Sequence, residues 1–533
     1  MVREVPDRVW ASQADLRNWV KHAEPMVSSA ADVHPSSARR RALLVIIGLG
    51  ALQLVGLASL WPGFWSPNEY SRVFAARAFV ARGSFEINDE LTRFGCIDDV
   101  ARVGSSYYSN KPPGLIWACV PVVAAVHLVH PQASPAVDLY CCRVALVSFS
   151  SLGAAWLLAL WVKRRRETLL SPAEAAFLLL FATPFGVYSG LLFAHSWTGF
   201  LVLATAFLLL GEGCETGSWR SAVLAGLCAG LALGSEYPAA VVIGPIILAG
   251  AWRCWRRWLA IAVGAILPLI ALGLYNSACF GSPLTVSYRF EAVPRYHRLS
   301  QQMLFGFGTP SLTGLAGLLV SPLAGLLFFA PVLLPAMGVP VVLWRRGEKR
   351  LAAGVAGAVW LLPLIMSGYA EWSGGATFGP RYLVLGIPLW ILALACLRPN
   401  RSIDLWVLAA LAPSAVVALL GRITPPFAID DVATASTLRG WSLPTLVHGL
   451  WNTPLGVTDR TLAAWCLAAV ACAWVAAGVV AFGSRWKRSP VRVRLLVVAL
   501  AAVLLSVQLG IGTVTPRQQK WLRWVAPSFM NLK

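Results

Sequence analysis

Charged side chains are scarce in this sequence of 533 residues, where they make up 13% of the chain. A soluble globular protein carries roughly a quarter. With 57% hydrophobic residues and a mean hydropathy of +0.67, the composition excludes a soluble domain, a disordered chain and a collagen-like repeat. One membrane-spanning helix uses about 20 apolar residues, and the chain holds enough for a dozen or more. The sequence therefore predicts an all-α polytopic membrane protein.

Paired cysteines and zinc-ligand spacings are also missing. The 11 Cys show no paired spacing in loops, and most lie inside apolar runs, where a thiol behaves as a small hydrophobic side chain. No set of His, Cys and carboxylates has the spacing of a zinc site, so we predict no metal ligands. A divalent cation bound by Asp98 and Asp99 together with substrate oxygens stays open.

Acidic residues are few: 24 Asp and Glu face 44 Lys and Arg, for a net charge of +20. In a soluble protein this excess would suggest a nucleic-acid partner. Here the basic residues cluster between apolar segments, at positions 163–166, 253–257, 345–350, 398–401 and 485–494. Cytoplasmic loops collect Lys and Arg, so the excess marks topology and predicts no nucleic-acid partner. Counting crossings gives about 13 transmembrane helices, with the N-terminus cytoplasmic and the C-terminus outside.

The segment 62–139, between the first two predicted spans, is long and mostly polar. Within it, residues 115–128 are apolar but few, and Pro121 interrupts them. The span at 140–162 must enter from outside if the basic cluster that follows it is cytoplasmic, so residues 115–128 cannot also cross. We predict a half-inserted surface helix within a large outer loop.

This outer loop interleaves charges of both signs with aromatic residues, which predicts a polar cavity at the membrane surface that suits a ligand with a charged head and a lipid tail. Its acidic residues are Glu69, Glu86, Asp89, Glu90, Asp98 and Asp99, and its basic residues are Arg72, Arg77, Arg82, Arg93, Arg102 and Lys111. Glu69 and Arg72 are three apart and would share a helix face. A carboxylate beside a cation stays ionised and can act as a general base, while Arg72 can bind a phosphate. A local surface ion pair is the alternative.

Two further cations are candidate phosphate ligands. The double proline in Lys111-Pro112-Pro113 fixes an extended backbone and directs the Lys111 ammonium toward the membrane surface; a snorkelling lysine is the alternative. Arg381 follows a glycine-rich stretch and is either a second phosphate contact or a helix anchor.

Glu236 lies in an apolar stretch of sequence, and an ionisable residue at membrane depth is a functional candidate. The alternative is that Glu236 ends a loop at the membrane interface, where a charged side chain needs no functional explanation. A lone histidine such as His195 is more often a hydrogen-bonded interface residue than a ligand.

In this order, Asn68-Glu69 with Arg72, followed by Tyr107-Tyr108-Ser109-Asn110-Lys111-Pro112-Pro113, resembles the GT-C superfamily of polyprenyl-phosphate-dependent glycosyltransferases. The nearest branches are the protein O-mannosyltransferase-like enzymes of family 39 and the aminoarabinose-transferase-like enzymes. The stretches 183–195, 235–238, 275–283, 318–331 and 378–382 extend the likeness over most of the chain beyond the N-terminal tail.

Two positions depart from the family pattern. Asn68 stands where the family has Asp, and Asn110 stands where an acidic residue often precedes Lys-Pro-Pro. The carbohydrate-binding domain of eukaryotic relatives is absent, which indicates a bacterial enzyme of the inner (plasma) membrane with its active site on the extracytoplasmic side.

The resemblance implies a GT-C-type fold with juxtamembrane helices in the first extracytoplasmic loop. Residues 1–41 would form a cytoplasmic tail, 42–350 a catalytic transmembrane module including the outer loop 62–139, and 351–533 the C-terminal transmembrane helices. The implied reaction moves a hexose or pentose from a polyprenyl-phosphate carrier to a hydroxyl of a lipid, glycan or protein acceptor, with inversion. The implied catalytic residues are Glu69 and Asp99, and the implied substrate-binding residues are Arg72, Tyr108, Lys111, His195, Glu236, Arg381 and Tyr382.

Two other classes of function stay open. A transporter or flippase for lipid-linked saccharides would keep its ionisable residues on midplane helices with short loops, and only Glu236 favours it. A non-catalytic subunit with a degenerate transferase fold is kept open by Asn68 and Asn110.

Overall fold

The computed structural model describes residues 35–56, 66–211, 218–302, 304–375, 377–426, 434–447, 460–520 and 522–523. Most of the predicted tail at 1–41 and the end of the first predicted span lie outside the described residues. The described residues from 42 onward form one compact unit.

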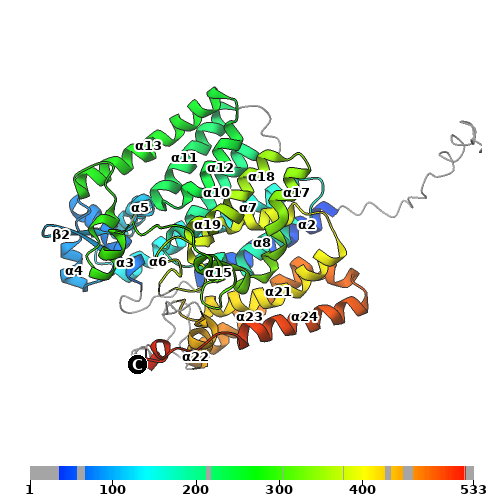
Figure 1. The fold of residues 1–533 in the computed structure, drawn as a ribbon. Helices are drawn as coiled ribbons and strands as arrows, with labels where there is room; N and C mark the ends of the chain where they lie inside the picture. Colours follow the sequence, from blue (N-terminus) through cyan, green and yellow to red (C-terminus); the bar gives the residue numbers. More distant parts are fainter. Residues whose placement is uncertain are drawn as a thin grey trace, which may run out of the picture. The chain divides into compact units, whose positions relative to one another are not determined.

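The described chain is helical except for one two-stranded hairpin, so the prediction of an all-α polytopic protein is confirmed (Figure 1). Within the described residues, six helices are long and apolar enough to cross a membrane. They are α6 to α7 (Pro135–Arg164), α13 (Trp255–Phe280), α18 to α19 (Lys349–Met366), α21 (Arg401–Ile423), α23 (Arg460–Arg488) and α24 (Val491–Gly510).

Shorter apolar helices of 10–17 residues occupy other predicted spans. They are α8 (Pro172–Phe181), α10 (Ala194–Leu210), α11 (Trp219–Ser235), α12 (Ala239–Ala251), the 3-10 helix η3 with α17 (Pro331–Arg345), and the 3-10 helix η5 (Arg381–Gly386) with α20 (Ile387–Ala395). Helix α2 (Pro35–Gly56) overlaps the first predicted span. The count of about 13 crossings stays a prediction.

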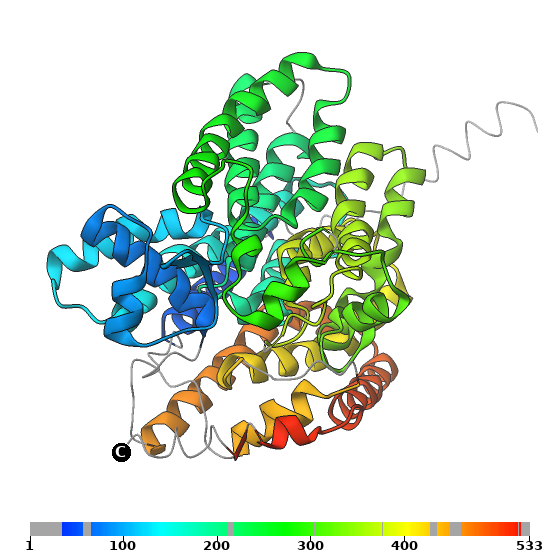
Figure 2. The same cartoon turned by 60° about the vertical axis from the view of Figure 1, so that its left-hand side comes forward.

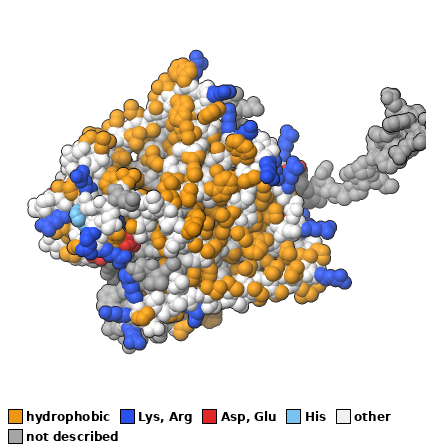
Figure 3. All heavy atoms as spheres, in the orientation of Figure 1, with side chains coloured by type: hydrophobic (Ala, Val, Ile, Leu, Met, Phe, Trp, Pro, Cys, Tyr) orange, Lys and Arg blue, Asp and Glu red, His pale blue; other side chains and the backbone are white. Residues whose placement is uncertain are grey.

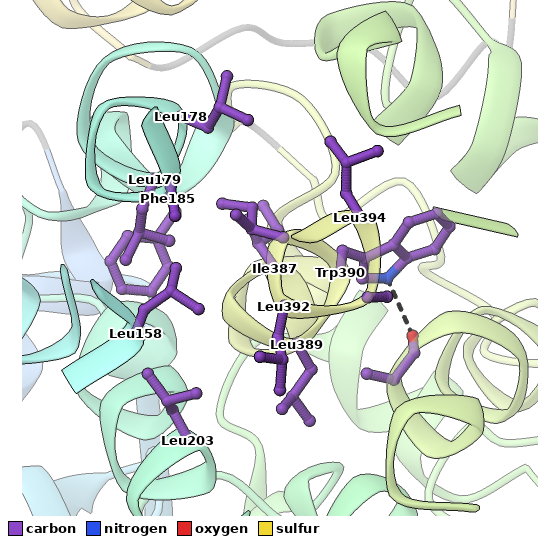
Figure 4. Close-up of a cluster of buried hydrophobic side chains, with 14 of the residues drawn as sticks. Leu158, Leu178, Leu179, Phe185, Leu203, Ile387, Leu389, Trp390, Leu392 and Leu394 are labelled. Atoms are coloured by element: carbon purple, nitrogen blue, oxygen red, sulfur yellow. Dashed lines mark hydrogen bonds between the residues drawn. The ribbon is translucent and has the colours of Figure 1, made fainter. Parts of the chain in front are cut away.

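The centre of the bundle is formed by α20, in which every residue is buried. A helix that is apolar on all sides belongs inside a bundle, and Figure 4 draws labelled side chains of α7, α8 and α10 along one side of α20, with Trp390 on the other side. The Trp390 indole donates a hydrogen bond of 3.1 Å to the Ala358 carbonyl, which satisfies its only polar group. By contrast, α13 and α24 expose large apolar side chains such as Leu267 and Leu495.

Apolar side chains cover most of the face drawn in Figure 3, and Lys and Arg side chains gather toward its edges. A monomeric soluble protein rarely exposes continuous apolar surface of this extent. The exposed helices therefore present a surface suited to lipid.

The predicted outer loop folds into α3 (Pro67–Arg82), α4 (Asn88–Phe94), the hairpin β1 (Val100–Val103) with β2 (Ser106–Ser109), and α5 (Gly114–Val129). These elements, blue to cyan, lie beside α11 and α13 in both ribbon views (Figures 1 and 2). Helix α3 starts with Pro67 in its first turn and ends at Gly83, whose φ of 67° is left-handed. Helix α5 coincides with the predicted surface helix at 115–128.

A second connection closes over the hairpin. The segment after α13 holds the 3-10 helix η2 (Ser287–Phe290) and α14 (Pro294–Ser300). Its Ala292 N–H donates to the Val100 carbonyl at 2.9 Å, and the Ser287 hydroxyl donates to the Asn110 carbonyl at 2.8 Å. These bonds fix the segment around η2 against both strands at the open end of the hairpin.

Candidate active site

Glu69 is fully buried near the start of α3 and is bound by Arg143 of the following membrane helix. The Arg143 Nε donates to Glu69 Oε1 at 2.8 Å and its Nη2 donates to Oε2 at 2.7 Å. The Leu192 N–H also donates to Oε1. Both carboxylate oxygens are therefore engaged, which suits an anchor that ties α3 to the membrane helices.

Glu69 and Arg72 share helix α3 but form no ion pair with each other among the described contacts. Arg72 instead donates to the Asn68 carbonyl at 2.7 Å and to the Asn68 side-chain oxygen. Spacing along one helix predicts a shared face but cannot predict that Arg143, which is 74 residues later, approaches the carboxylate from another helix.

Asp99 and Lys111 form an ion pair, with 3.1 Å between Asp99 Oδ2 and Lys111 Nζ. The hairpin explains why they meet: Val100 pairs with Ser109, so the residues just outside this pair emerge together at the open end of the hairpin. The side chains are only 20% and 11% exposed, and this partial burial strengthens their interaction.

Two arginines join this pair from distant elements. Burial raises the pKa of Asp99, but the charges of Lys111, Arg381 and Arg72 outweigh burial and hold it below its ordinary value. Lys111 has a lowered pKa because it is buried and because both arginines act on it. We call Arg72, Lys111 and Arg381 the cation cluster; the carboxylates that act on it are Asp99, Glu236 and Glu291.

Each arginine of the cation cluster has an unfilled donor. The Nε atoms of Arg72 and Arg381 are buried and have no hydrogen-bond acceptor among the described residues. Leaving a buried donor unpaired costs about 1–3 kcal/mol, and more for a charged group. Such groups commonly mark a ligand that would complete them.

The glycine-rich stretch before Arg381 follows a backbone path that requires glycine. Gly374, Gly375 and Gly379 have φ values of 85°, 67° and 62°, which side chains with a Cβ rarely adopt. This path places the Arg381 guanidinium 4.7 Å from the ring centroid of Tyr382 and 5.9 Å from that of Phe193. Its Nη2 donates to the Tyr382 hydroxyl at 3.1 Å.

His195 and Glu236 belong to the same neighbourhood. The His195 Nδ1 contacts the Glu236 carboxylate, and the His195 ring lies edge-on to Tyr382 at 6.2 Å. Burial lowers the pKa of Arg72, and the Glu236 carboxylate is the largest influence that opposes this. Glu236 follows the last residue of α11, so it is a helix-end residue and lies with the cation cluster.

Tyr108 is the predicted substrate ligand that the fold does not bring to the cation cluster. Its ring packs edge-on against Phe280, with 5.8 Å between ring centroids, in an apolar cluster that also contains Tyr275 and Ala101. Along β2 the side chains alternate in direction, and Tyr108 is on the face that packs against α13.

Glu291 is a carboxylate that sequence reasoning missed. The Asn110 side-chain amide donates to its Oε2 at 2.8 Å. Burial raises the pKa of Glu291 to about 7, although Lys111 and the Asn110 hydrogen bond oppose the change. The sequence offered one signal: a lone acidic residue among Arg289, Arg295 and Arg298 in an outer connection.

The described residues do not fit a divalent cation at Asp98 and Asp99. Asp98 is exposed, whereas Asp99 is held by Lys111. Within the described ranges, no group of three His, Cys, Asp or Glu could hold a metal ion. We therefore derive no step through a metal.

Comparisons with known proteins gave matches only among solved structures. No family model matches the sequence, and no curated protein matches it. The chain is similar to ArnT from Cupriavidus metallidurans bound to undecaprenyl phosphate, with 16% identity, a TM-score of 0.47, and coverage of 88% of this chain and 75% of that one.

Two other solved structures are similar over much of this chain. The archaeal oligosaccharyltransferase AglB from Archaeoglobus fulgidus, in complex with an inhibitory peptide and a dolichol-phosphate, has 11% identity, a TM-score of 0.43 and coverage of 80% and 59%. The arabinosyltransferase EmbB from Mycobacterium smegmatis has 16% identity, a TM-score of 0.39 and coverage of 89% and 40%. All three proteins are GT-C glycosyltransferases, the superfamily that the motifs of this sequence resemble.

Proposed function

We propose that the protein is an integral membrane glycosyltransferase that moves a sugar from a polyprenyl-phosphate carrier to an acceptor hydroxyl on the extracytoplasmic face. The observation that carries the proposal is the cation cluster, in which the buried Nε donors of Arg72 and Arg381 lack acceptors among the described residues. Lys111 lies close enough to both arginines for their charges to lower its pKa.

Phosphate is the ligand that such a cluster suits best. A guanidinium group presents several donors in a plane that matches phosphate oxygens, and a lysine adds a compact charge. Asp99 forms an ion pair with Lys111, whereas the buried Nε donors of Arg72 and Arg381 have no acceptor among the described residues, which favours an anion with several acceptor oxygens.

The location of the cluster fits a donor with a lipid tail. Arg72 and Lys111 come from the outer loop and Arg381 from the start of η5, and the charge pattern predicts both places on the outer side. A polyprenyl chain would lie along the exposed apolar helices while its phosphate enters the polar pocket.

In the proposed reaction the acceptor hydroxyl loses its proton to a carboxylate, and its oxygen attacks the anomeric carbon. The bond from that carbon to the phosphate oxygen breaks, its electron pair leaves with the lipid phosphate, and the configuration inverts. The growing negative charge is stabilised by Arg72, Lys111 and Arg381. Asp99 orients Lys111 across the 3.1 Å ion pair, and Glu69 anchors α3 through Arg143.

The transporter alternative loses its main support. Glu236 favoured it as an isolated acidic residue at membrane depth, but its carboxylate contacts His195 and acts on Arg72. It therefore supports the same pocket as the cations.

The test uses the full-length protein in lipid nanodiscs with polyprenyl phosphates that carry a hexose or a pentose, and with water as the acceptor. We expect slow release of free sugar, with Lys111→Met and Arg381→Gln each reducing the rate by about 10²–10³, the usual effect of losing one preorganised contact. Arg82→Gln is the matched control, since Arg82 forms ion pairs on the same loop surface with Asp89 and Glu90. Lipid translocation in vesicles without cleavage would refute the transferase.

A further inference from the structure

We propose that Glu291 is the catalytic base: its Oε1 atom accepts the proton of the acceptor hydroxyl beside the cation cluster. This inference rests on the proposed glycosyltransferase function and assigns a role to a residue that the sequence motifs do not include.

The backbone holds Glu291 in a fixed place. Glu291 forms an isolated antiparallel bridge with Ala101 of β1, and the neighbouring Ala292 N–H donates to Val100 at 2.9 Å. At the start of η2, the Ser287 hydroxyl donates to the carbonyl of Asn110. The segment is therefore attached to both strands at the open end of the hairpin, the end from which Asp99 and Lys111 emerge, so the three side chains lie at the same end of the hairpin.

The two oxygens of Glu291 are in different situations. Oε2 accepts the Asn110 amide at 2.8 Å, which fixes the plane of the carboxylate. No described residue donates a hydrogen bond to Oε1, which leaves it available to a hydroxyl. Both oxygens of Glu69, in contrast, are engaged by Arg143, and Asp99 is committed to Lys111.

Charges around Glu291 set its proton affinity. The charges of Lys111 and Asp99 at the hairpin interact with the Glu291 carboxylate. The charge of Glu291 also interacts with the hydroxyls of Tyr288 in η2 and Tyr369 after α19. Burial raises its pKa to about 7, with Asp99 adding to the change and Lys111 opposing it. A base near neutral pKa combines a substantial ionised fraction with a useful proton affinity.

Asp99 is a weaker candidate for the catalytic base, because its proton affinity is lower. The cation cluster holds its pKa below the ordinary value, so it stays ionised but has little tendency to take a proton. The arrangement divides two tasks between two carboxylates: Asp99 stays charged and positions Lys111, while Glu291 changes its protonation state.

The proposed step balances as follows. The acceptor O–H proton moves to Glu291 Oε1, the acceptor oxygen forms a bond to the anomeric carbon, and the bond from that carbon to the phosphate oxygen breaks. The lipid phosphate leaves with the electron pair and gains one negative charge, which the cation cluster stabilises. The protonated Glu291 then releases its proton to solvent.

The experiment compares Glu291→Gln with the wild type in nanodiscs, using polyprenyl-phosphate hexose and pentose donors. With water as the acceptor we expect a 10²–10⁴-fold loss of sugar release, the range typical of a removed general base. With azide, an anion that has no proton to lose, the variant should form glycosyl azide at close to the wild-type rate. Lys111→Met should stay slow with either acceptor, because it lacks a contact to the leaving group.

The pH profile gives a second readout. The rate of sugar release by the wild type should fall below about pH 7 as Glu291 becomes protonated, whereas the rate of Glu291→Gln should not show this fall. Glu291→Asp should release sugar more slowly than the wild type but still lose activity as the pH is lowered. Asp89→Asn is the control, because Asp89 is 64% exposed in the same loop and should keep the wild-type profile.

The outcomes separate the two proposals. An inactive wild type that does not bind undecaprenyl phosphate would overturn the proposed function and the inference with it. An active wild type with a Glu291→Gln variant that releases sugar normally would overturn the inference alone. Failure of azide to rescue a variant with the wild-type melting temperature would also overturn it, because it would indicate a positioning role.

Discussion

At the scale of single residues, the fold separates two carboxylates that look alike in the sequence. Glu69 and Glu291 are both glutamates in predicted outer segments, but Glu69 is 0% exposed and paired with Arg143. Glu291 has one oxygen held by Asn110 and faces Lys111. The difference comes from partners far away in the chain, so one is suited to holding helices together and the other to moving a proton.

Glu69→Gln should destabilise the protein before it affects any chemistry. Removing one partner of a buried ion pair leaves the other charge uncompensated and typically costs about 3–5 kcal/mol. We expect a lower melting temperature in detergent, measured by following tryptophan fluorescence.

The double variant Glu69→Gln with Arg143→Gln supplies the control for this prediction. It removes both charges, so it should be more stable than Glu69→Gln alone. A Glu69→Gln protein that melts like the wild type but fails to release sugar would contradict the anchoring role and restore Glu69 as the base.

At the scale of elements, the pocket depends on how closely α5 approaches α11. A Cβ built at Gly114 would lie 2.7 Å from the backbone of both Gly234 and Ser235, a separation that real Cβ atoms do not show. The glycine therefore lets the start of α5 touch the end of α11, and this contact fixes the chain three residues after Lys111.

Gly114→Ala should push α5 away from α11 and thereby move Lys111. We expect a lower melting temperature together with weaker binding of undecaprenyl phosphate, measured by tryptophan quenching or by native mass spectrometry. The two effects should appear together because one contact supports both.

Gly48→Ala is the matched substitution in a helix. Gly48 lies inside α2, and a Cβ added there would meet no atom within 4 Å, while alanine is the better helix former by about 1 kcal/mol. This variant should keep lipid binding and be at least as stable as the wild type. Equal behaviour of the two alanine variants would contradict the packing argument.

At the scale of the whole molecule, segments predicted on the outer side converge. The hairpin end, the start of α10, the end of α11, η2 and the start of η5 contribute ionisable side chains that act on one another. The basic residues at 163–166, 253–257 and 398–401 lie at the opposite ends of their helices. This segregation is what the positive-inside rule requires of a protein with its active site outside.

Native cysteines can test this topology without the introduction of new cysteines. Cys96 is exposed in the outer loop, and Cys254 lies between α12 and α13 at a predicted cytoplasmic end. In intact spheroplasts a membrane-impermeant maleimide should label Cys96, and labelling should disappear in Cys96→Ser. Cys254 should be labelled only after the membrane is permeabilised, and the reverse order would invert the topology.

The sequence by itself determined the class of the protein and selected several candidate residues of the site. Scarce charge and long apolar runs are sufficient to predict a helical membrane protein, because a bilayer accepts little else. The basic clusters indicated which helix ends share a side, and the motifs selected Lys111, Arg381, His195 and Glu236 as candidates.

Only the tertiary structure decided the pairing of charges. The interaction of Glu69 with Arg143 and the approach of Glu291 to Asn110 join residues 74 and 181 positions apart. Local spacing carries no information about such contacts, since they depend on how separate helices pack. The same packing places Tyr108 in an apolar cluster, because a side chain on one face of a strand contacts whichever element covers that face.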